Sequence, residues 1–493
     1  MDADRAWRLD ASTLRRYVAS GELSSEALVR ATLARIEALD GQARAFVTVD
    51  ADAALAAARE ADALRRRTTL LPPLHGLPVA VKDVIATAGL RTTFGSRLFA
   101  GHVPDRDAAA VARVRRAGGI VIGKTTTPEF AHKVLTDSLV SGVTRNPWSA
   151  AHSAGGSSGG AAVAAAMGFA SLNVATDGAG SARVPASCCG VVGLKPTMGR
   201  IPNEGAPDVF GLQVIGLIAR SVADLRLLLG VLAGPLDADP LSWGARPGRD
   251  PVAGLAGLRV RWLPRMGNAH VAADVLAACT RTLAAMVAAG AIVDEGAAID
   301  WAHDACRILL RAQQAARFRA LPDAQRDLLD PGFRACVDEG VAQRAADLQD
   351  AMLARTALFR RVQGLLDGAD VLASPVVATP ALSATHAADQ HVLVDGHDGG
   401  SLREGWYCYT VPFNATGHPA IVLPCGVDRA GVPIGLQLVA PWLREHRLLR
   451  IAQALRGITK LPDRWPAAAE GVPAQGAGTP APAAPARRKR SPA

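Results

Sequence analysis

The most informative stretch of this 493-residue chain covers residues 153–190 and reads SAGGSSGGAAVAAAMGFASLNVATDGAGSARVPASCCG. Its first part places Ser157 and Ser158 between two glycine pairs, directly before an Ala-rich run that predicts a helix. Glycine on both sides of a serine pair permits backbone geometry that larger residues forbid. In isolation this pattern is more typical of a flexible loop or a phosphate-binding loop than of a catalytic site.

The second part of the stretch leads into Ser181 through Gly178, Ala179 and Gly180. A run of small residues before a serine can align successive backbone N–H groups. Such groups can hold a developing oxyanion beside a hydroxyl nucleophile, and one donor of this kind contributes roughly 3–4 kcal/mol to catalysis. Ser181 is therefore a candidate nucleophile.

The stretch also contains a pattern that is typical of a different serine hydrolase. Residues 156–160 match G-x-S-x-G, the nucleophile elbow of Ser-His-Asp hydrolases. An elbow needs a strand before the serine, whereas residues 145–154, RNPWSAAHSA, are typical of a loop. This disfavours a Ser-His-Asp site on Ser158. Cys188 and Cys189 are further candidate nucleophiles, although buried and inert thiols are the more common case.

Upstream, residues 77–85 read LPVAVKDVI and predict a strand that carries Lys82 into an apolar setting. Loss of hydration destabilises the ammonium form, so the pKa of such a lysine falls and the amine can act as a base. Only six of the 54 Lys and Arg residues are lysines. Arginine cannot take over this task because it stays protonated. A snorkelling or ion-paired lysine is nevertheless the more common role of such a residue.

Strands and helices alternate around these segments. A helical pattern at residues 107–118 is followed by an apolar strand at 118–126, which predicts an α/β fold with a mixed or parallel sheet. Ser24 and Ser25 are candidate N-caps of an early helix. Further helices are expected at 23–41, at 51–67 and through most of 270–366, and further strands at 369–377, 419–427 and 434–441, the last two as a hairpin.

We divide the chain into three parts. Residues 1–70 form a helical region that packs on the core, and residues 71–465 form the main domain, with a variable and mostly helical segment at about 235–405. Residues 466–493 are rich in Pro and Ala, are basic and contain almost no large apolar residues. This composition predicts a disordered tail.

A long loop is expected at residues 376–405, with histidines at positions 386, 391 and 397. Loops of this length in compact domains often serve as lids or binding loops. The histidines His386, His391 and His397 could reach a site beneath such a lid, and they could equally be ordinary solvent-exposed residues.

Composition excludes several classes of protein. Hydrophobic residues make up 49% and charged residues 20%, which favours a large buried core. The seven cysteines contain no CxxC pair, which argues against a disulfide framework or a zinc knuckle. With a net charge of +9 and only 4% aromatic residues, we expect no nucleic-acid partner.

Targeting signals are absent from the sequence pattern. The N-terminus, MDADRAWRLD, carries charges where a signal peptide needs an apolar run. The uncharged stretch at residues 153–176 is too weakly hydrophobic for a membrane span. We therefore expect a cytoplasmic protein without a membrane contact.

Together these segments resemble the amidase signature family. The serine pair and Ser181 match the family's loops, with Ser157 and Ser181 separated by the family's 24 positions, and the Lys-Asp pair at 82–83 also matches. The resemblance covers roughly residues 20–460, with only a loose match at 235–405. Further matching motifs are GKTTTPEF (123–130), NPW (146–148), GVVGLKPTMGRIP (190–202), FNATGHPAIVLPCG (413–426) and GVPIGLQLVAP (431–441).

The resemblance implies an amidase signature fold, with a central mixed, twisted sheet covered on both faces by helices. It also implies a Ser–cis-Ser–Lys triad. Ser181 would be the nucleophile, Ser157 would follow a cis peptide bond and relay the proton, and neutral Lys82 would be the base. No metal or organic cofactor is implied.

The resemblance assigns supporting roles as well. The oxyanion hole would consist of the backbone N–H groups of Gly178, Ala179, Gly180 and Ser181. The side chain of Ser158 would support Lys82 by a hydrogen bond. Asp177 and Arg183 would brace the nucleophile loop, and the alternative for this pair is an ordinary surface ion pair.

Two positions depart from the family's usual pattern. The family commonly has Thr-Gly-Gly-Ser before the nucleophile, whereas this chain has Gly178-Ala179-Gly180-Ser181. The missing side chain at Gly178 suggests room for a bulkier or differently shaped acyl group. Thr126 stands where Asn is common. Both departures leave the triad intact and weaken any transfer of substrate.

The predicted function is hydrolysis of the C–N bond of small to medium apolar or aryl amides through an acyl-enzyme intermediate. One alternative is a carbamate (urethane) hydrolase that uses the same triad. The other is the glutamine-hydrolysing subunit of an amidotransferase, which would need partner subunits. The expected ligand is a small-molecule amide or carbamate, and we leave a homodimer open.

Overall fold

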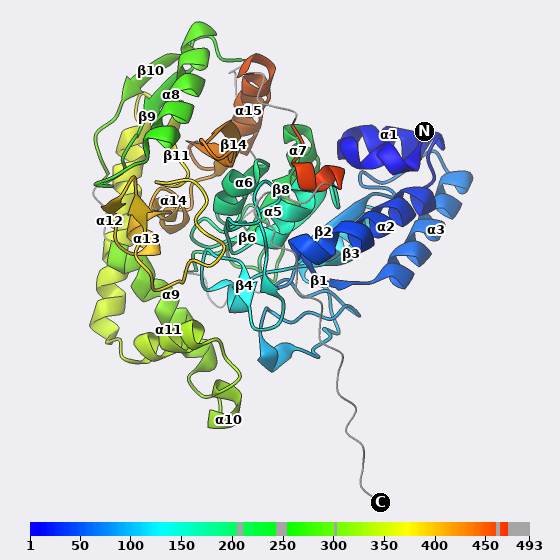
Figure 1. Cartoon of the computed structure of the whole chain (residues 1–493), viewed down its shortest axis with the longest axis horizontal. Coiled ribbons are helices and arrows are strands. Elements are labelled where there is room, and N and C mark those ends of the chain that lie inside the picture. Colours follow the sequence, from blue (N-terminus) through cyan, green and yellow to red (C-terminus); the bar gives the residue numbers. More distant parts are fainter. Residues whose placement is uncertain (205–210, 243–253, 300–302, 460–463, 472–493) are drawn as a thin grey trace, which may run out of the picture.

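The computed structural model describes residues 1–204, 211–242, 254–299, 303–459 and 464–471. Within this part of the chain, one mixed sheet of eleven strands has the order β1-β3-β2-β6-β8-β7-β14-β15-β11-β9-β10 (Figure 1). Its strands are β1 (Phe46–Val49), β2 (Pro78–Lys82), β3 (Ile120–Thr125), β6 (Leu172–Asp177), β7 (Val192–Lys195), β8 (Val214–Ala219), β9 (Arg259–Trp262), β10 (Ile292–Glu295), β11 (Val371–Pro375), β14 (Ala420–Val427) and β15 (Pro433–Val439).

The direction of the strands changes along the sheet. Strand β2 pairs in parallel with both β3 and β6, whereas β8 is antiparallel to β6 and to β7. The predicted hairpin at the C-terminal end is present as the antiparallel pair β14 and β15. The fold class predicted from the sequence, an α/β fold with a mixed central sheet, is therefore confirmed.

The middle strands are buried on both faces, because helices cover the sheet from either side. Every residue of β2, β6, β7 and β8 is buried. Helices α5 (Gly159–Ala166) and α6 (Arg183–Cys189) pack on one face, and α7 (Val222–Leu232), α8 (Ala273–Ala288) and α15 (Glu445–Thr459) pack on the other.

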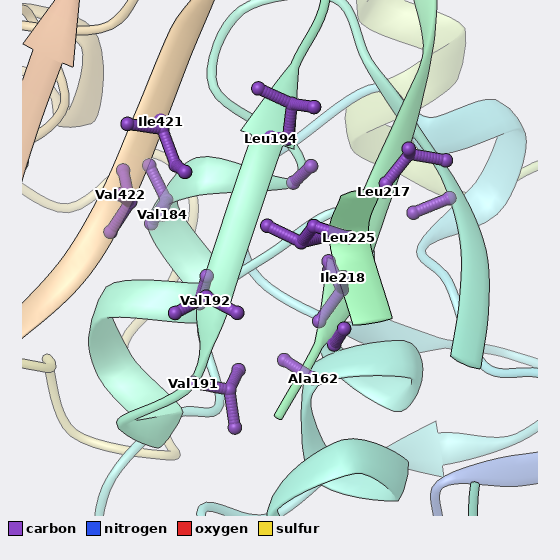
Figure 2. Close-up of a cluster of buried hydrophobic side chains, with 14 of the residues drawn as sticks. Ala162, Val184, Val191, Val192, Leu194, Leu217, Ile218, Leu225, Ile421 and Val422 are labelled. Carbon is purple, nitrogen blue, oxygen red and sulfur yellow. The ribbon is translucent and has the colours of Figure 1, made fainter. Parts of the chain in front are cut away.

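Branched aliphatic side chains fill the space between these layers. Figure 2 shows Val184 of α6 beside Ile421 and Val422 of β14, with Leu194 of β7 and Leu225 of α7 in the same cluster. Burial of such side chains contributes roughly 1.5–3 kcal/mol each. The catalytic candidates therefore lie on elements that a continuous core holds in place.

Three N-terminal helices lie at one end of the sheet (Figure 1): α1 (Ala11–Ser20), α2 (Ser25–Ala43) and α3 (Ala51–Arg67). The predicted N-cap is present at Ser24, whose side chain accepts a hydrogen bond from the N–H of Ala27. The predicted helix at 107–118 is α4 (Ala109–Arg116).

The segment between β8 and β11 contains more strand than the sequence pattern predicts. Besides α7 and α8, its described helices are α9 (His303–Phe318), α10 (Asp323–Arg326), α11 (Pro331–Val341) and α12 (Ala345–Leu366). Within the predicted helical region 270–366, however, β10 adds an edge strand beside β9. Its residues are mostly exposed, so the strand lacks the apolar alternation from which it could have been predicted.

The expected long loop at 376–405 has some regular structure. It contains the two-residue strands β12 (Leu393–Val394) and β13 (His397–Asp398), which pair with each other, and α13 (Leu402–Gly405). A short helix, α14 (Val411–Ala415), precedes β14, and a separate small hairpin joins β4 (Asp137–Ser138) to β5 (Gly142–Val143).

The first residues of the predicted disordered tail have regular structure. Residues 467–470 form a 3₁₀ helix, and the side chains of Arg8 and Glu470 form an ion pair with an N–O distance of 2.6 Å. Just before it, the ring of Trp465 lies 4.6 Å from the ring of Trp7. These contacts with the N-terminal region explain the difference, and residues 472–493 lie outside the described part. None of the described helices combines the length and apolar character of a membrane span.

Candidate active site

Lys82 is the last residue of β2, and its side chain is fully buried. Its Nζ donates hydrogen bonds to the Oγ of Ser157 at 2.7 Å and to the Oγ1 of Thr176 at 2.8 Å. Burial lowers the pKa of Lys82 to about 7, while the negative charge of Asp177 acts in the opposite direction. Near neutral pH a large share of this amine is therefore unprotonated and able to accept a proton.

The loop that carries Ser157 is held rigidly. The peptide bond between Gly156 and Ser157 is cis, as the resemblance implies. Thr136 fixes the loop from both ends, because its hydroxyl accepts from the N–H of Gly159 at 3.0 Å and donates to the carbonyl of Gly155 at 2.8 Å. The glycine pairs thus belong to a fixed turn, and the flexible-loop alternative is wrong.

Close packing explains why glycine is needed in this turn. A Cβ on Gly156 would lie 2.6 Å from the backbone carbon of Val134 and 2.8 Å from the backbone of Leu135. Real Cβ atoms do not approach backbone this closely, so a side chain would push the turn away from the segment that precedes β4.

Ser181 follows β6 on a loop that Asp177 and Arg183 organise. Both side chains are fully buried, with 2.9 Å between Arg183 Nη2 and Asp177 Oδ1. The carboxylate also accepts from the N–H groups of Gly180 at 2.8 Å and Ala182 at 3.1 Å. Burial alone would raise the pKa of Asp177, but the charge of Arg183 holds this pKa well below its usual range. The surface ion-pair alternative is therefore wrong.

The predicted oxyanion hole loses one donor. The N–H of Gly180 is occupied by Asp177, so it does not point toward a reacting carbonyl. Within the described residues, the N–H groups of Gly178, Ala179 and Ser181 donate to no protein acceptor. These three remain as candidates for the hole.

Two hydrogen bonds of Ser158 join the loops. Its N–H donates to the carbonyl of Ser181 at 3.0 Å, which holds the two serine loops side by side. Its hydroxyl donates to the carbonyl of Thr176 at 3.1 Å, not to Lys82 as expected. The second partner of Lys82 is the hydroxyl of Thr176, which sequence reasoning missed. Thr176 comes directly before Asp177 on β6, a strand that pairs with β2, and this position could have predicted its contact with Lys82.

Ser181 is 6% exposed and opens onto a cavity of about 90 Å³, the serine cavity. Aromatic side chains from separate segments line it, among them Phe130, Phe318 of α9, Phe333 of α11 and Tyr407. A larger cavity of about 510 Å³ adjoins it and shares Phe130 and Thr176 with it. Phe318 and Phe333 come from the loosely matching segment, so no motif in the sequence predicts them.

Neither the two cysteines nor the loop histidines belong to the site. Burial raises the pKa of Cys188 to about 12, and burial also raises the pKa of Cys189 far above its usual value. Both are inert core thiols, as expected. His391 pairs with Asp398 at an exposed position, with 3.0 Å between Nδ1 and Oδ2. Among the described residues, no histidine of the 376–405 loop lines either cavity at Ser181.

Comparisons with known proteins identify the family of the chain. The family model described as Amidase matches residues 27–449, and the chain belongs to this family. It is therefore a hydrolase that acts on C–N bonds of amides.

Individual relatives cover nearly the whole chain. The acylamidase of Rhodococcus erythropolis is 35% identical over 469 residues, which cover 93% of this chain and 97% of the relative. A glutamyl-tRNA(Gln) amidotransferase subunit of Roseiflexus sp. (strain RS-1) is 36% identical over 488 residues, which cover 93% of this chain and 98% of the relative.

Solved structures show the same fold. A bacterial aryl acylamidase of the amidase signature family superposes with a TM-score of 0.88 at 23% identity, covering 94% of this chain and 99% of that one. A 6-aminohexanoate cyclic dimer hydrolase superposes with a TM-score of 0.81 at 30% identity, with the same coverage of both chains. The predicted amidase signature fold is thereby confirmed.

Proposed function

We propose that the chain hydrolyses amides through a Ser181–Ser157–Lys82 triad and an acyl-enzyme. The observation that carries this proposal is the 2.7 Å hydrogen bond from Lys82 to Ser157, made by an amine whose pKa burial lowers to about 7. A base with a pKa near the working pH combines the correct protonation state with useful basicity.

In the first step, Ser181 Oγ attacks the carbonyl carbon and gives its proton to Ser157 Oγ, whose own proton passes to Lys82 Nζ. The carbonyl oxygen gains the negative charge, and the N–H groups of Gly178, Ala179 and Ser181 stabilise it in this proposal. When the C–N bond breaks, the proton returns through Ser157 to the leaving nitrogen. Water then attacks the acyl-enzyme by the same route, which releases the acid and restores Ser181.

The substrate class that we propose is acyl and aryl amides. The aromatic side chains of Phe130, Phe318 and Phe333 offer flat apolar surfaces beside Ser181. The relationship to an acylamidase supports the same class. Aryl carbamates belong to the test set, because attack on a carbonyl bonded to nitrogen would use the same residues.

A second candidate function is hydrolysis of glutamine for transfer of ammonia to a partner. It is favoured by the 36% identity to a subunit of a glutamyl-tRNA(Gln) amidotransferase. This candidate predicts glutaminase activity that depends on partner subunits, whereas the acylamidase candidate predicts full activity of the purified chain.

One panel separates these candidates. The purified chain and its Ser181→Ala variant are assayed with an acyl anilide, a primary amide, an aryl carbamate and glutamine at equal concentration. We expect the highest kcat/KM with the anilide, and a loss of roughly 10³-fold or more in kcat for the variant. Dominant glutaminase activity would reject the proposed substrate class, and a variant with unchanged kcat would reject the nucleophile.

A further inference from the structure

The serine cavity carries positive charge without a matching acid. Arg317, at the end of α9, and Arg403, in α13, both line it, whereas no Asp or Glu of the described residues does. Lys133 lines it too, but its ammonium is engaged by Asp137 and Asp330, with N–O distances of 2.5 and 3.7 Å. The two arginines therefore give this cavity a net positive charge.

Arg403 has an unused donor at this place. Its Nη1 is buried and has no hydrogen-bond partner in the described part of the chain. The guanidinium lies near the ring of Tyr407, at 5.7 Å from the ring centroid. Buried polar groups are nearly always paired in native proteins, so an unpaired guanidinium N–H on a residue that lines a cavity points to a ligand.

Arg317 lines the same cavity from the end of α9, where part of its side chain is exposed to solvent. Its guanidinium lies 5.3 Å from the ring centroid of Phe318 and forms no ion pair with any described residue. Because Arg317 lines both the serine cavity and the adjoining larger one, its charge lies where the two spaces meet.

The acids of the larger cavity are engaged elsewhere. Asp107 pairs with Arg115 at 3.0 Å, and Asp105 pairs with Arg106 at 3.7 Å. The carboxylate of Glu204 accepts a hydrogen bond from the backbone of Ala109. Among the described residues, none of these acids forms an ion pair with Arg317.

We propose that Arg317 and Arg403 bind a carboxylate group of the substrate, so that the preferred substrates are amides with an anionic group near the scissile bond. A guanidinium presents two parallel N–H donors that match a carboxylate, and such charge-assisted bonds are among the strongest in proteins. Phe318 and Phe333 then contact the apolar part between the carboxylate and the amide. This inference rests on the proposed function, because it takes Ser181 as the reacting residue.

Two pairs of probes test the inference and locate the charge. Glutaranilic acid and hexananilide differ in a carboxylate on the acyl side, whereas 4-acetamidobenzoate and acetanilide differ in a carboxylate on the amine side. We expect the wild type to prefer the acid of one pair by about tenfold to hundredfold in kcat/KM, mainly through a lower KM. The pair that shows the preference identifies the side that carries the charge.

The variants Arg317→Gln and Arg403→Gln should each remove most of this preference, and Arg317→Lys should restore only part of it because lysine lacks the paired donors. Arg319→Gln is the matched control, since Arg319 is exposed one residue beyond α9 and lines neither cavity. The control should keep the full preference. Neutral probes that equal or exceed the acids in both pairs, with the wild type, would overturn the inference.

Binding measurements keep this test separate from catalysis. Calorimetry with the Ser181→Ala variant measures the affinity of each probe without turnover. An acid that binds more tightly than its neutral partner supports the inference if the added substitution Arg317→Gln or Arg403→Gln removes this difference. This result counts even if no probe is hydrolysed. Equal binding of acid and neutral probes refutes it, whereas the turnover panel alone decides the proposed function.

Discussion

Asp177 and Arg183 form an ion pair in which neither side chain is accessible to solvent, and the carboxylate of Asp177 also binds the N–H groups of Gly180 and Ala182. The guanidinium extends the network further, because it donates to the side-chain oxygens of Gln437 and Asn414. The nucleophile loop is therefore anchored to β15 and α14, which follow it by more than 200 residues.

Removal of one partner of this pair should strongly destabilise the protein. Arg183→Met leaves the Asp177 carboxylate buried without its counter-ion, and such changes cost about 3–5 kcal/mol. We expect a clear decrease in the urea midpoint, followed by intrinsic fluorescence. Arg344→Ala removes the exposed pair with Asp347 and is the control, since its midpoint should match the wild type. A wild-type midpoint for Arg183→Met would contradict this role.

The rate should rise with pH around neutrality. Lys82 must be unprotonated to act as the base, and burial lowers its pKa to about 7. Below this pH the amine is protonated and kcat/KM should fall about tenfold per pH unit, and above it the rate should level off. Lys82→Arg should lower kcat by roughly 10²-fold or more at every pH, because the guanidinium stays charged. A pH profile of anilide hydrolysis from 5 to 9 measures both effects, and a flat profile would argue against Lys82 as the base.

Gly180 should not tolerate a side chain. Its φ is +119°, and a Cβ there would lie 2.8 Å from the Cβ of Thr410, whose hydroxyl holds the carbonyl of Ala179. Gly180→Ala should therefore displace the loop and reduce kcat by about 10²-fold, as misplacement by an ångström can do. Gly41→Ala in α2 has open space around its new methyl group and should behave as the wild type. Equal kcat values for the two variants would show that the loop accepts the strain.

The aromatic wall of the serine cavity, formed by Phe130, Phe318 and Phe333, should contribute to the stability of the fold and to substrate specificity. Phe333 is fully buried, with its ring centroid 4.8 Å from that of Phe130 and 5.2 Å from that of Phe318. Phe333→Ala should cost about 3–5 kcal/mol of folding free energy. The space it leaves should favour bulkier aryl amides in a kcat/KM series of increasing ring size. Unchanged relative rates across the series would show that the wall does not contact substrate.

Local sequence determined the chemistry of the site. Glycine pairs around Ser157, the small residues before Ser181 and an apolar strand ending at Lys82 each have a local physical meaning, because backbone freedom, aligned N–H groups and lysine desolvation depend on nearby residues. The same is true of the predicted strands β2, β3, β14 and β15, whose apolar runs are bounded by turn residues.

Only the tertiary structure decided which groups meet. Thr176 replaces Ser158 as the partner of Lys82 because β2 and β6 are neighbours in the sheet, and Asp177 takes the N–H of Gly180 because the loop folds back on the strand end. The cavity wall combines Phe130 with Phe318 and Phe333, nearly 200 residues further on. Arg317 of α9 and Arg403 of α13 line the same cavity, and no local pattern encodes that two segments so far apart in the chain share it.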